Sequence, residues 1–352
     1  MQTDPTSIAE TLNNHFSSIG KKLAKAFSGA LPDQCFACSS NFSLQPVTIS
    51  FVEEQLSQLK INKAIGLDNI SARLLRDSAS VLARSLRYII NLSLESGRFP
   101  SSWKCAKVTA LFKQGDRSDK DNYRPISILP TVSKVIERAV HSQLNGYLAS
   151  NNLLFVNQFG FRRGRSTSLA LTRFTDEVLG NLDKGLVNGV VFTDLKKAFD
   201  TVDHGIMLKK LKAIGVTSTD LAWFDSYLSS RCQKTVIGQV SSSTRRVTVG
   251  VPQGSILGPL LFTIYINDLP NVLKNSSVTL FADDTALYCS SESAYRLQTL
   301  LNHDLDRPAQ WLFKHKLTVN VSESKFMLIG GNKKLNSFND VTLSIMDRKL
   351  IE

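Results

Sequence analysis

The sequence lacks any apolar stretch long enough to span a bilayer, which argues against an integral membrane protein. Its longest nearly uninterrupted apolar run is ILGPLLFTIYI, residues 256–266, whereas a membrane-spanning helix needs roughly 20 residues. The chain also does not open with the basic segment and apolar core of a secretory signal. We therefore expect an intracellular protein with no membrane partner.

Cysteine is scarce, with five residues in a chain of 352, and the five are scattered. Cys35 and Cys38 form a lone CxxC without a second pair. This spacing favours a plain reduced pair over a zinc or redox site, although both remain open. A reducing compartment is the interpretation that the cysteines support.

Acidic residues are fewer than basic ones, 30 against 42, which gives a net charge of +12. Such an excess favours a polyanionic partner, either nucleic acid or an anionic membrane surface. The basic residues are spread in small groups such as FRRGR at 161–165 rather than in one long run. With 42% apolar and 20% charged residues, the chain has the composition of a folded globular protein.

Apolar periodicity predicts helices and strands that interleave without a regular alternation. The predicted helices cover residues 7–27, 50–60, 71–94, 131–149, 167–183, 204–214 and 257–268. Strands or hairpins are predicted at 105–113, 188–195, 234–249 and 278–289, and polar loops at 28–46, 114–125 and 158–167. This order favours an α+β fold over a doubly wound sheet.

Two adjacent aspartates interrupt the apolar hairpin VTLFADDTALYC, residues 278–289. Asp283 and Asp284 would repel each other there, and Asp194 ends a second apolar strand, VVFTD. Aspartate is common in turns for backbone reasons alone. Three carboxylates are also hard oxygen donors that suit Mg²⁺ or Mn²⁺, and a bound cation would remove the repulsion.

The order of three motifs is more specific than any one of them. FTDLKKAFD (192–200) is followed by VPQGSILGP (251–259) and then by FADDT (281–285). This combination resembles the reverse transcriptase domain of non-LTR retrotransposons of the jockey and chicken-repeat-like kind. LFKQGDRSDKDNYRPISILPTVSKVIERAV, NQFGFRRGRST and GRFPSSWKCAKV resemble further segments of that family, so the likeness extends over nearly the whole chain.

The resemblance implies an RNA-directed DNA polymerase that adds deoxynucleotides to a DNA primer on an RNA template. Asp194 and Asp283 would hold two Mg²⁺ or Mn²⁺ ions that activate the primer 3′-hydroxyl and stabilise the leaving pyrophosphate. Asp284 would be an accessory carboxylate. Such proteins assemble on RNA in the cytoplasm and act on DNA in the nucleus, so either compartment fits.

The resemblance also assigns binding residues. Lys113 and Arg124 would grip the triphosphate, and Phe199 would exclude a ribose 2′-hydroxyl. The nucleotide-binding set is Lys113, Arg124, Phe199, Gln253, Gly254 and Ser255. The template-binding set is Arg162, Arg163 and Arg165. For each of these residues a structural or solvated role is the alternative; the QGS residues, for instance, could simply start a helix.

The implied architecture is a right-handed polymerase with fingers and an antiparallel palm sheet backed by helices. We expect a helix and linker at 1–46, a helical extension at 47–104, fingers and palm at 105–340, and the start of a primer grip and thumb at 341–352. An endonuclease would precede this chain and a thumb would follow it in a larger element protein.

One departure from the family pattern bears on activity. Glu323 and Ser324 stand where the family usually carries a Lys-Thr pair, and Lys325 lies two positions after Glu323. The alternative hypothesis is therefore a truncated or degenerate copy that binds nucleic acid without catalysis. An unrelated metal-dependent phosphatase fits the motif order poorly.

Overall fold

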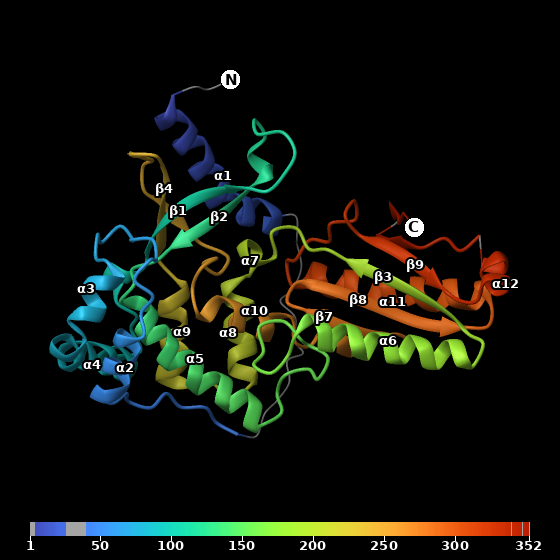
Figure 1. The fold of residues 1–352 in the computed structure, drawn as a ribbon, viewed down its shortest axis with the longest axis horizontal. Coiled ribbons are helices and arrows are strands. Elements are labelled where there is room, and N and C mark those ends of the chain that lie inside the picture. The colour runs from blue at the N-terminus through green and yellow to red at the C-terminus, as the bar shows by residue number, and fades with distance from the viewer. Residues whose placement is uncertain (1–3, 26–39, 339, 347, 352) are drawn as a thin grey trace. The chain divides into compact units, whose positions relative to one another are not determined.

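The computed structural model describes residues 4–25, 40–338, 340–346 and 348–351, in which helices and strands are mixed (Figure 1). Contacts divide these residues into two compact units. The first unit contains residues 4–25, 40–153 and 199–261, and the second contains residues 154–198 and those from 262 onward. Each unit is built from segments that are separated in the sequence.

The first unit contains a small sheet with the order β2-β1-β4-β5, and β6 also pairs with β4. Its strands are β1 (Cys105–Phe112), β2 (Tyr123–Ile128), β4 (Arg231–Ile237), β5 (Val240–Ser241) and β6 (Arg245–Val247). Helix α1 (Pro5–Lys25) packs on this sheet because Leu12 and Phe16 are buried with Val108 and Leu129 in one apolar cluster.

Helices make up the rest of the first unit. They are α2 (Ile49–Ser57), α3 (Ala72–Asp77), α4 (Ala79–Ser96), α5 (Ser133–Ser150), α8 (His204–Ala213) and α9 (Ser218–Leu228), with η1 (Ser101–Trp103) and η2 (Lys120–Asn122). Trp223 and Tyr227 of α9 stack with ring centroids 5.6 Å apart, and Phe99 packs edge-on against both rings. These buried aromatic side chains form much of the core between α4 and α9.

The second unit contains an antiparallel sheet with the order β7-β8-β3-β9. Its strands are β3 (Val187–Thr193), β7 (Ser277–Phe281), β8 (Asp284–Ser291) and β9 (Lys325–Ile329), and a small hairpin follows from β10 (Ser344–Ile345) and β11 (Arg348–Lys349). The remaining elements are α6 (Thr167–Asp183), α11 (Ala294–Lys314), α12 (Asn332–Leu335), η3 (Leu269–Val272) and η4 (Asn336–Phe338). Two short helices, α7 (Ala198–Thr201) and α10 (Leu257–Ile266), cross the boundary between the units.

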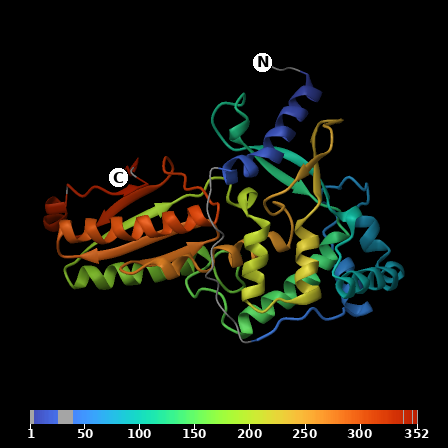
Figure 2. The ribbon, with the colours of Figure 1, turned by 180° about the vertical axis from the view of Figure 1, so that it is seen from behind.

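Helices α6 and α11 pack on opposite faces of this sheet. Figure 2 shows α11 running in front of the strands, and a Cβ on Gly189 would meet Leu301 of α11 at 2.5 Å. On the other face, Tyr288 of β8 contacts Phe174 of α6 with ring centroids 5.0 Å apart. Because neighbouring residues of a strand point to opposite faces, Thr193 faces α11 and Asp194 belongs to the α6 face.

Most of the predicted elements are present, with some corrections. The single helix predicted at 71–94 is wrong, because Ser78 ends α3 and begins α4. Ala72 and Leu75 are buried in α3, and Ala83 and Ile90 are buried in α4. The predicted loop at 114–125 also ends early, since β2 begins at Tyr123. Helices α9 and α11 and strand β9 were not predicted from the sequence.

Two further expectations concern membrane-spanning helices and the cysteines. None of the helices in the described ranges is long and apolar enough to cross a membrane. Cys35 and Cys38 lie outside the described residues, so the CxxC interpretation stays a prediction. Cys105, Cys232 and Cys289 are free thiols.

Candidate active site

The predicted acidic residues gather at one end of the sheet in the second unit. Thr193 of β3 pairs with Thr285 of β8 in antiparallel register. Asp194 follows Thr193 and Asp284 precedes Thr285, so these two aspartates lie side by side. Residues opposite each other on antiparallel strands have Cβ atoms about 4.5–5.5 Å apart. The sheet therefore joins two acidic positions that are 90 residues apart in the chain (284 − 194).

Asp283 reaches the same end of the sheet through a tight hairpin. Phe281 pairs with Asp284, which leaves Ala282 and Asp283 as the two central residues of the turn. Ala282 has φ +59°, the left-handed conformation that a two-residue hairpin needs at its first central position. Asp283 is half-buried and Asp284 is exposed.

Asn320 orients the carboxylate of Asp194. Its Nδ2 donates to Asp194 Oδ2 at 2.8 Å, and its backbone N–H donates to the Asp194 carbonyl at 2.8 Å. Ser324 completes this attachment, because its Oγ accepts from the Asp194 N–H at 3.3 Å and donates to the Asn320 carbonyl at 2.9 Å. Asn320 and Ser324 are 8% and 1% exposed, so these bonds are shielded from water.

This geometry bears on the departure at positions 323 and 324. Ser324 supplies a hydroxyl where the family usually has threonine, and that hydroxyl binds the backbone of Asp194. Glu323 is exposed. Lys325 of β9 pairs with Phe192 of β3, which lies two residues before Asp194. Because alternate residues of a strand share a face, Lys325 lies on the same face of the sheet as Asp194.

The face that carries Asp194 is open near the acidic end. Phe192 and Met327 belong to this face by strand alternation, and each is 43% exposed. The same face is covered by α6 farther along the strands.

The acidic end fits a divalent ion that takes part of its coordination from a substrate. Among the described residues, no three Asp, Glu, His or Cys side chains come close enough to form a complete protein cage for a metal. Mg²⁺ does not require such a cage, because it is usually held by one or two carboxylates together with waters and substrate phosphates. Asp194 and Asp283 are the two carboxylates predicted to hold such an ion.

In the first unit, Lys113 and Arg124 lie on the β1–β2 hairpin. Leu111 pairs with Arg124, and the Lys113 N–H donates to the Asn122 carbonyl at 2.8 Å, so the pairing continues to Lys113. Lys113 and Arg124 therefore share one face of the hairpin as diagonal neighbours. Both side chains are exposed, as two cations that bind a polyphosphate must be.

The QGS loop is fixed in the first unit by its backbone. Gly254 has φ +125°, and a Cβ there would lie 2.3 Å from the Ser127 carbonyl oxygen. Ser255 Oγ accepts from the Gly258 N–H at 3.0 Å and donates to the Pro252 carbonyl at 2.8 Å, so it caps the start of α10. Ser255 and Gly254 thus have structural contacts, and their contact with a nucleotide stays a prediction.

A buried carboxylate anchors the same loop. Glu137 Oε2 accepts from the Ile256 N–H at 2.7 Å, from the Leu257 N–H at 3.3 Å and from the Tyr227 hydroxyl at 3.3 Å. Glu137 is fully buried, and that burial raises its pKa, while Arg231 favours the charged form. A carboxylate at a helix N-terminus satisfies amide groups that have no partner within the helix.

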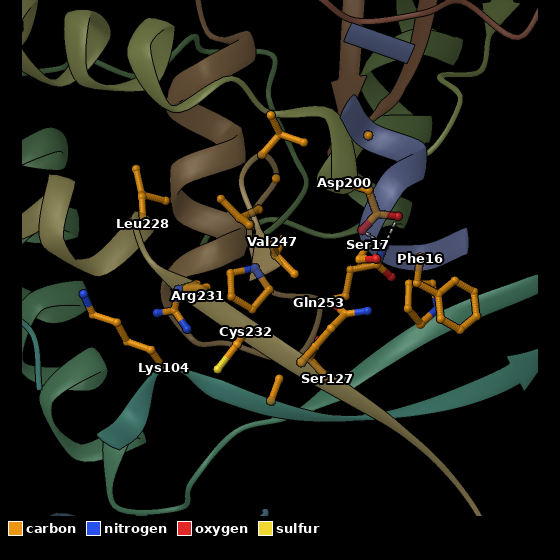
Figure 3. A pocket seen from close by; sticks show the side chains of 18 of the residues that line it. Phe16, Ser17, Lys104, Ser127, Asp200, Leu228, Arg231, Cys232, Val247 and Gln253 are labelled. Carbon is orange, nitrogen blue, oxygen red and sulfur yellow. Dashed lines mark hydrogen bonds between the residues drawn. The ribbon is translucent and has the colours of Figure 1, made fainter. Parts of the chain in front are cut away.

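Gln253 lines a pocket of the first unit together with Asp200 (Figure 3). Its Nε2 donates to both carboxylate oxygens of Asp200, at 2.9 and 3.0 Å. The neighbouring Phe199 accepts from the Val251 N–H through its carbonyl at 2.8 Å. The QGS loop and the helical turn after β3 are therefore joined through Asp200 and Phe199.

The three template-binding candidates lie in one loop of the second unit but differ in their surroundings. Arg162 Nη1 donates to the Phe155 carbonyl at 2.7 Å, and the guanidinium of Arg165 lies 5.2 Å from the centre of the Phe159 ring. Both side chains are half-buried, whereas Arg163 is exposed. Arg163 is the member of this group best placed to meet a ligand.

Sequence reasoning missed three residues that support the site: Asn320, Asp200 and Gln158. Asn320 lies in LTVNVSESK, a segment noted only for its Glu-Ser pair. Asp200 is the last residue of the quoted FTDLKKAFD motif, and an acidic residue beside Phe199 was the available signal. Gln158 is the first residue of the predicted Gly/Arg-rich loop.

A model of one protein family matches residues 112–343, and its description is "Reverse transcriptase (RNA-dependent DNA polymerase)". The chain belongs to the reverse transcriptase family. The matched range contains all three aspartates and both basic candidates of the β1–β2 hairpin. The family predicted from the motifs is thereby confirmed.

Relatives point to the same kind of mobile element. The chain is 31% identical over 285 residues to "Probable RNA-directed DNA polymerase from transposon BS" of Drosophila melanogaster, which covers 79% of this chain and 31% of that protein. It is also 31% identical over 331 residues to "RNA-directed DNA polymerase from mobile element jockey" of Drosophila funebris, covering 90% and 34%. The chain spans about a third of the length of these relatives. This reverse transcriptase is thus similar to those of non-LTR retrotransposons.

Proposed function

We propose that this chain provides the fingers and palm of an RNA-directed DNA polymerase that extends a DNA primer on an RNA template with deoxynucleotides. The observation that carries the proposal is the strand register that brings Asp194 and Asp284 together, with Asp283 in the adjoining turn, on an open sheet face. Membership in the reverse transcriptase family supports assigning nucleotidyl transfer to this acidic end. The sheet of the second unit would be the palm, and the β1–β2 hairpin of the first would belong to the fingers.

Two Mg²⁺ or Mn²⁺ ions, when bound, would lower the pKa of the primer 3′-hydroxyl and neutralise charge on the phosphates. Asp194 and Asp283 would hold these ions, and the Asn320 amide would fix Asp194 Oδ2 so that Oδ1 can face an ion. Asp284 would add negative field beside them. Each of these contributions depends on the backbone positions at the end of the sheet.

The remaining residues would bind the nucleotide and the template. Lys113 and Arg124 would pair with the triphosphate through charge-assisted hydrogen bonds. Phe199 and Gln253, joined through Asp200 and Val251, would contact the sugar and base of the incoming nucleotide. Arg163 would meet the template backbone. Glu323 has the opposite charge to the lysine that the family usually carries there, and Lys325, which pairs with Phe192, would take that part from the face of the sheet that carries Asp194.

The decisive experiment is Mg²⁺-dependent incorporation of deoxynucleotides on a primed RNA. The wild-type chain should extend the primer, and Asp283→Asn should reduce the rate by at least ~100-fold, the scale of removing one charge-stabilising group from an active site. Asp306→Asn, at an exposed position on α11, is the matched control and should retain the wild-type rate.

Equal product from the wild type and Asp283→Asn would contradict the proposal. Absence of extension by all variants, combined with salt-sensitive RNA binding, would instead favour a copy that binds nucleic acid without catalysis. Such binding would weaken by a slope of about 0.7 to 0.9 in log affinity per log salt for each neutralised phosphate.

A further inference from the structure

The turn that carries Asp283 has a backbone conformation that L-residues rarely adopt. Ala282 has φ +59° and is 6% exposed. A glycine would be the usual choice at such a position, because it has no Cβ to clash. A strained residue of this kind persists only where its surroundings hold it in place.

Gln158 holds both backbone polar groups of Ala282. Its Oε1 accepts from the Ala282 N–H at 3.1 Å, and its Nε2 donates to the Ala282 carbonyl at 3.5 Å. The same Oε1 also accepts from the Gly160 N–H at 2.8 Å. Gln158 is 1% exposed, so water does not compete for these bonds.

The backbone around Gln158 follows the edge of the sheet and fixes the amide at the turn. The Phe159 N–H donates to the Leu280 carbonyl at 2.8 Å, and the Leu280 N–H donates to the Asn157 carbonyl at 2.9 Å. A Cβ on Gly160 would lie 2.2 Å from the Ala282 nitrogen, so the two segments are in direct backbone contact.

We propose that Gln158 is a positioning residue that holds the Ala282 turn and thereby fixes where Asp283 and Asp284 stand relative to Asp194. It touches neither the substrate nor an ion, and it acts through the backbone of the hairpin. Its catalytic consequence rests on the proposed function, whereas its structural consequence does not. The geometry predicts that loss of the amide loosens the acidic hairpin while the rest of the sheet stays folded.

The first test needs only the wild-type chain. Hydrogen exchange resolved at single residues should show the Ala282 amide protected to the same degree as the interior amides of β8, although Ala282 lies in a turn. Exchange of this amide at the rate of an open turn would overturn the proposal, because a held N–H exchanges only when the structure opens.

The second test compares Gln158→Ala with a matched loss of a buried amide in the same sheet. Asn188 on β3 is fully buried, accepts from Asn181 Nδ2 at 2.8 Å and pairs with Ser290 at the opposite end of the strand from Asp194. Gln158→Ala should speed exchange at residues 282–284 and weaken Mn²⁺ binding, measured by the free-ion signal in electron paramagnetic resonance, by roughly 10- to 100-fold. Asn188→Ala should leave both quantities near wild type, and equal effects of the two variants would overturn the proposal.

The third test asks whether strain is what Gln158 opposes. Ala282→Gly removes the steric penalty of the left-handed conformation, so the double variant Gln158→Ala/Ala282→Gly should recover protection at 282–284 relative to Gln158→Ala alone. Failure of this rescue would overturn the proposal. The exchange measurements need neither an ion nor a substrate, so they remain interpretable even if primer extension fails.

Discussion

In the second unit, Asp194 and Asp284 end neighbouring strands of an antiparallel sheet, whereas in the first unit Gln253 and Ser255 belong to a loop that leads into α10. The acidic end is supported from outside, because Asn320, Ser324 and Gln158 hold its backbone and one carboxylate oxygen. In the QGS loop the motif residues themselves make structural contacts, since Ser255 caps α10 and Gly254 packs on Ser127, and the buried Glu137 anchors the next two backbone amides.

A motif residue is therefore not necessarily a ligand-binding residue. The residue type at a motif position can be required by the backbone, as at Gly254, or by the chemistry, as proposed for Asp283. Substitutions separate these cases, because a backbone requirement changes stability and a chemical requirement changes rate.

The largest expected effect is on stability in the first unit. Gly254→Ala would put a Cβ 2.3 Å from the Ser127 carbonyl at φ +125°, and it should lower the free energy of unfolding by on the order of 3 kcal/mol. Gly238→Ala is the matched control, because Gly238 also has positive φ, +59°, but nothing within 4 Å of its Cβ position. Gly238→Ala should lower the free energy of unfolding by only about 1 kcal/mol. Equal losses in thermal or urea unfolding would show that space at the loop is not limiting.

The next effect is on rate in the second unit. Asn320→Ala removes the amide that orients Asp194 and should slow primer extension by roughly 10- to 100-fold, as loss of outer-shell partners does at metal sites. Asn320→Asp should be worse, because it sets a second carboxylate where Nδ2 now lies 2.8 Å from Asp194 Oδ2. Asn271→Asp, which adds the same charge at an exposed position, is the control. A wild-type rate for Asn320→Asp would argue that Asp194 needs no orienting partner.

A smaller effect is expected at the contact between Asp200 and Gln253 in the pocket of the first unit. Asp200→Asn loses the charge that accepts two hydrogen bonds from Gln253, and it should cost about 1.5 kcal/mol of stability. If Gln253 also contacts the nucleotide, the Michaelis constant for deoxynucleotides should rise as well. Stability loss with an unchanged Michaelis constant would assign Gln253 a structural role alone.

The smallest effect is a pH dependence in the first unit. Burial lowers the pKa of His204, whose Nε2 is 2.8 Å from the Gly250 carbonyl oxygen. The unfolded chain therefore binds a proton at His204 near pH 6.5, whereas the folded chain binds it only at lower pH. The free energy of unfolding consequently falls as the pH drops below about 6.5. His204→Gln keeps a donor for Gly250 and should lose less stability between pH 7.5 and pH 5. An unchanged pH profile in denaturant unfolding would contradict this assignment.

Much of the element pattern could be predicted from local sequence. The helix predicted at 167–183 is α6 to the residue, because Ser166 caps it and its apolar positions recur at helical spacing. Helix α11 was missed although it is 21 residues long, and Pro308 inside it is a residue that normally signals a break. The split at Ser78 was missed because the apolar period continues across it.

Residue types in a fixed order were enough to identify the family and its acidic residues, and composition was enough for the basic charge. Which oxygens are oriented, and by which side chains, follows from the folded chain, since hydrogen bonds such as Asn320 to Asp194 and Gln158 to Ala282 join residues more than 120 positions apart. Spacing along a chain cannot report such contacts, because strand register and loop packing bring them about only when the whole sheet forms.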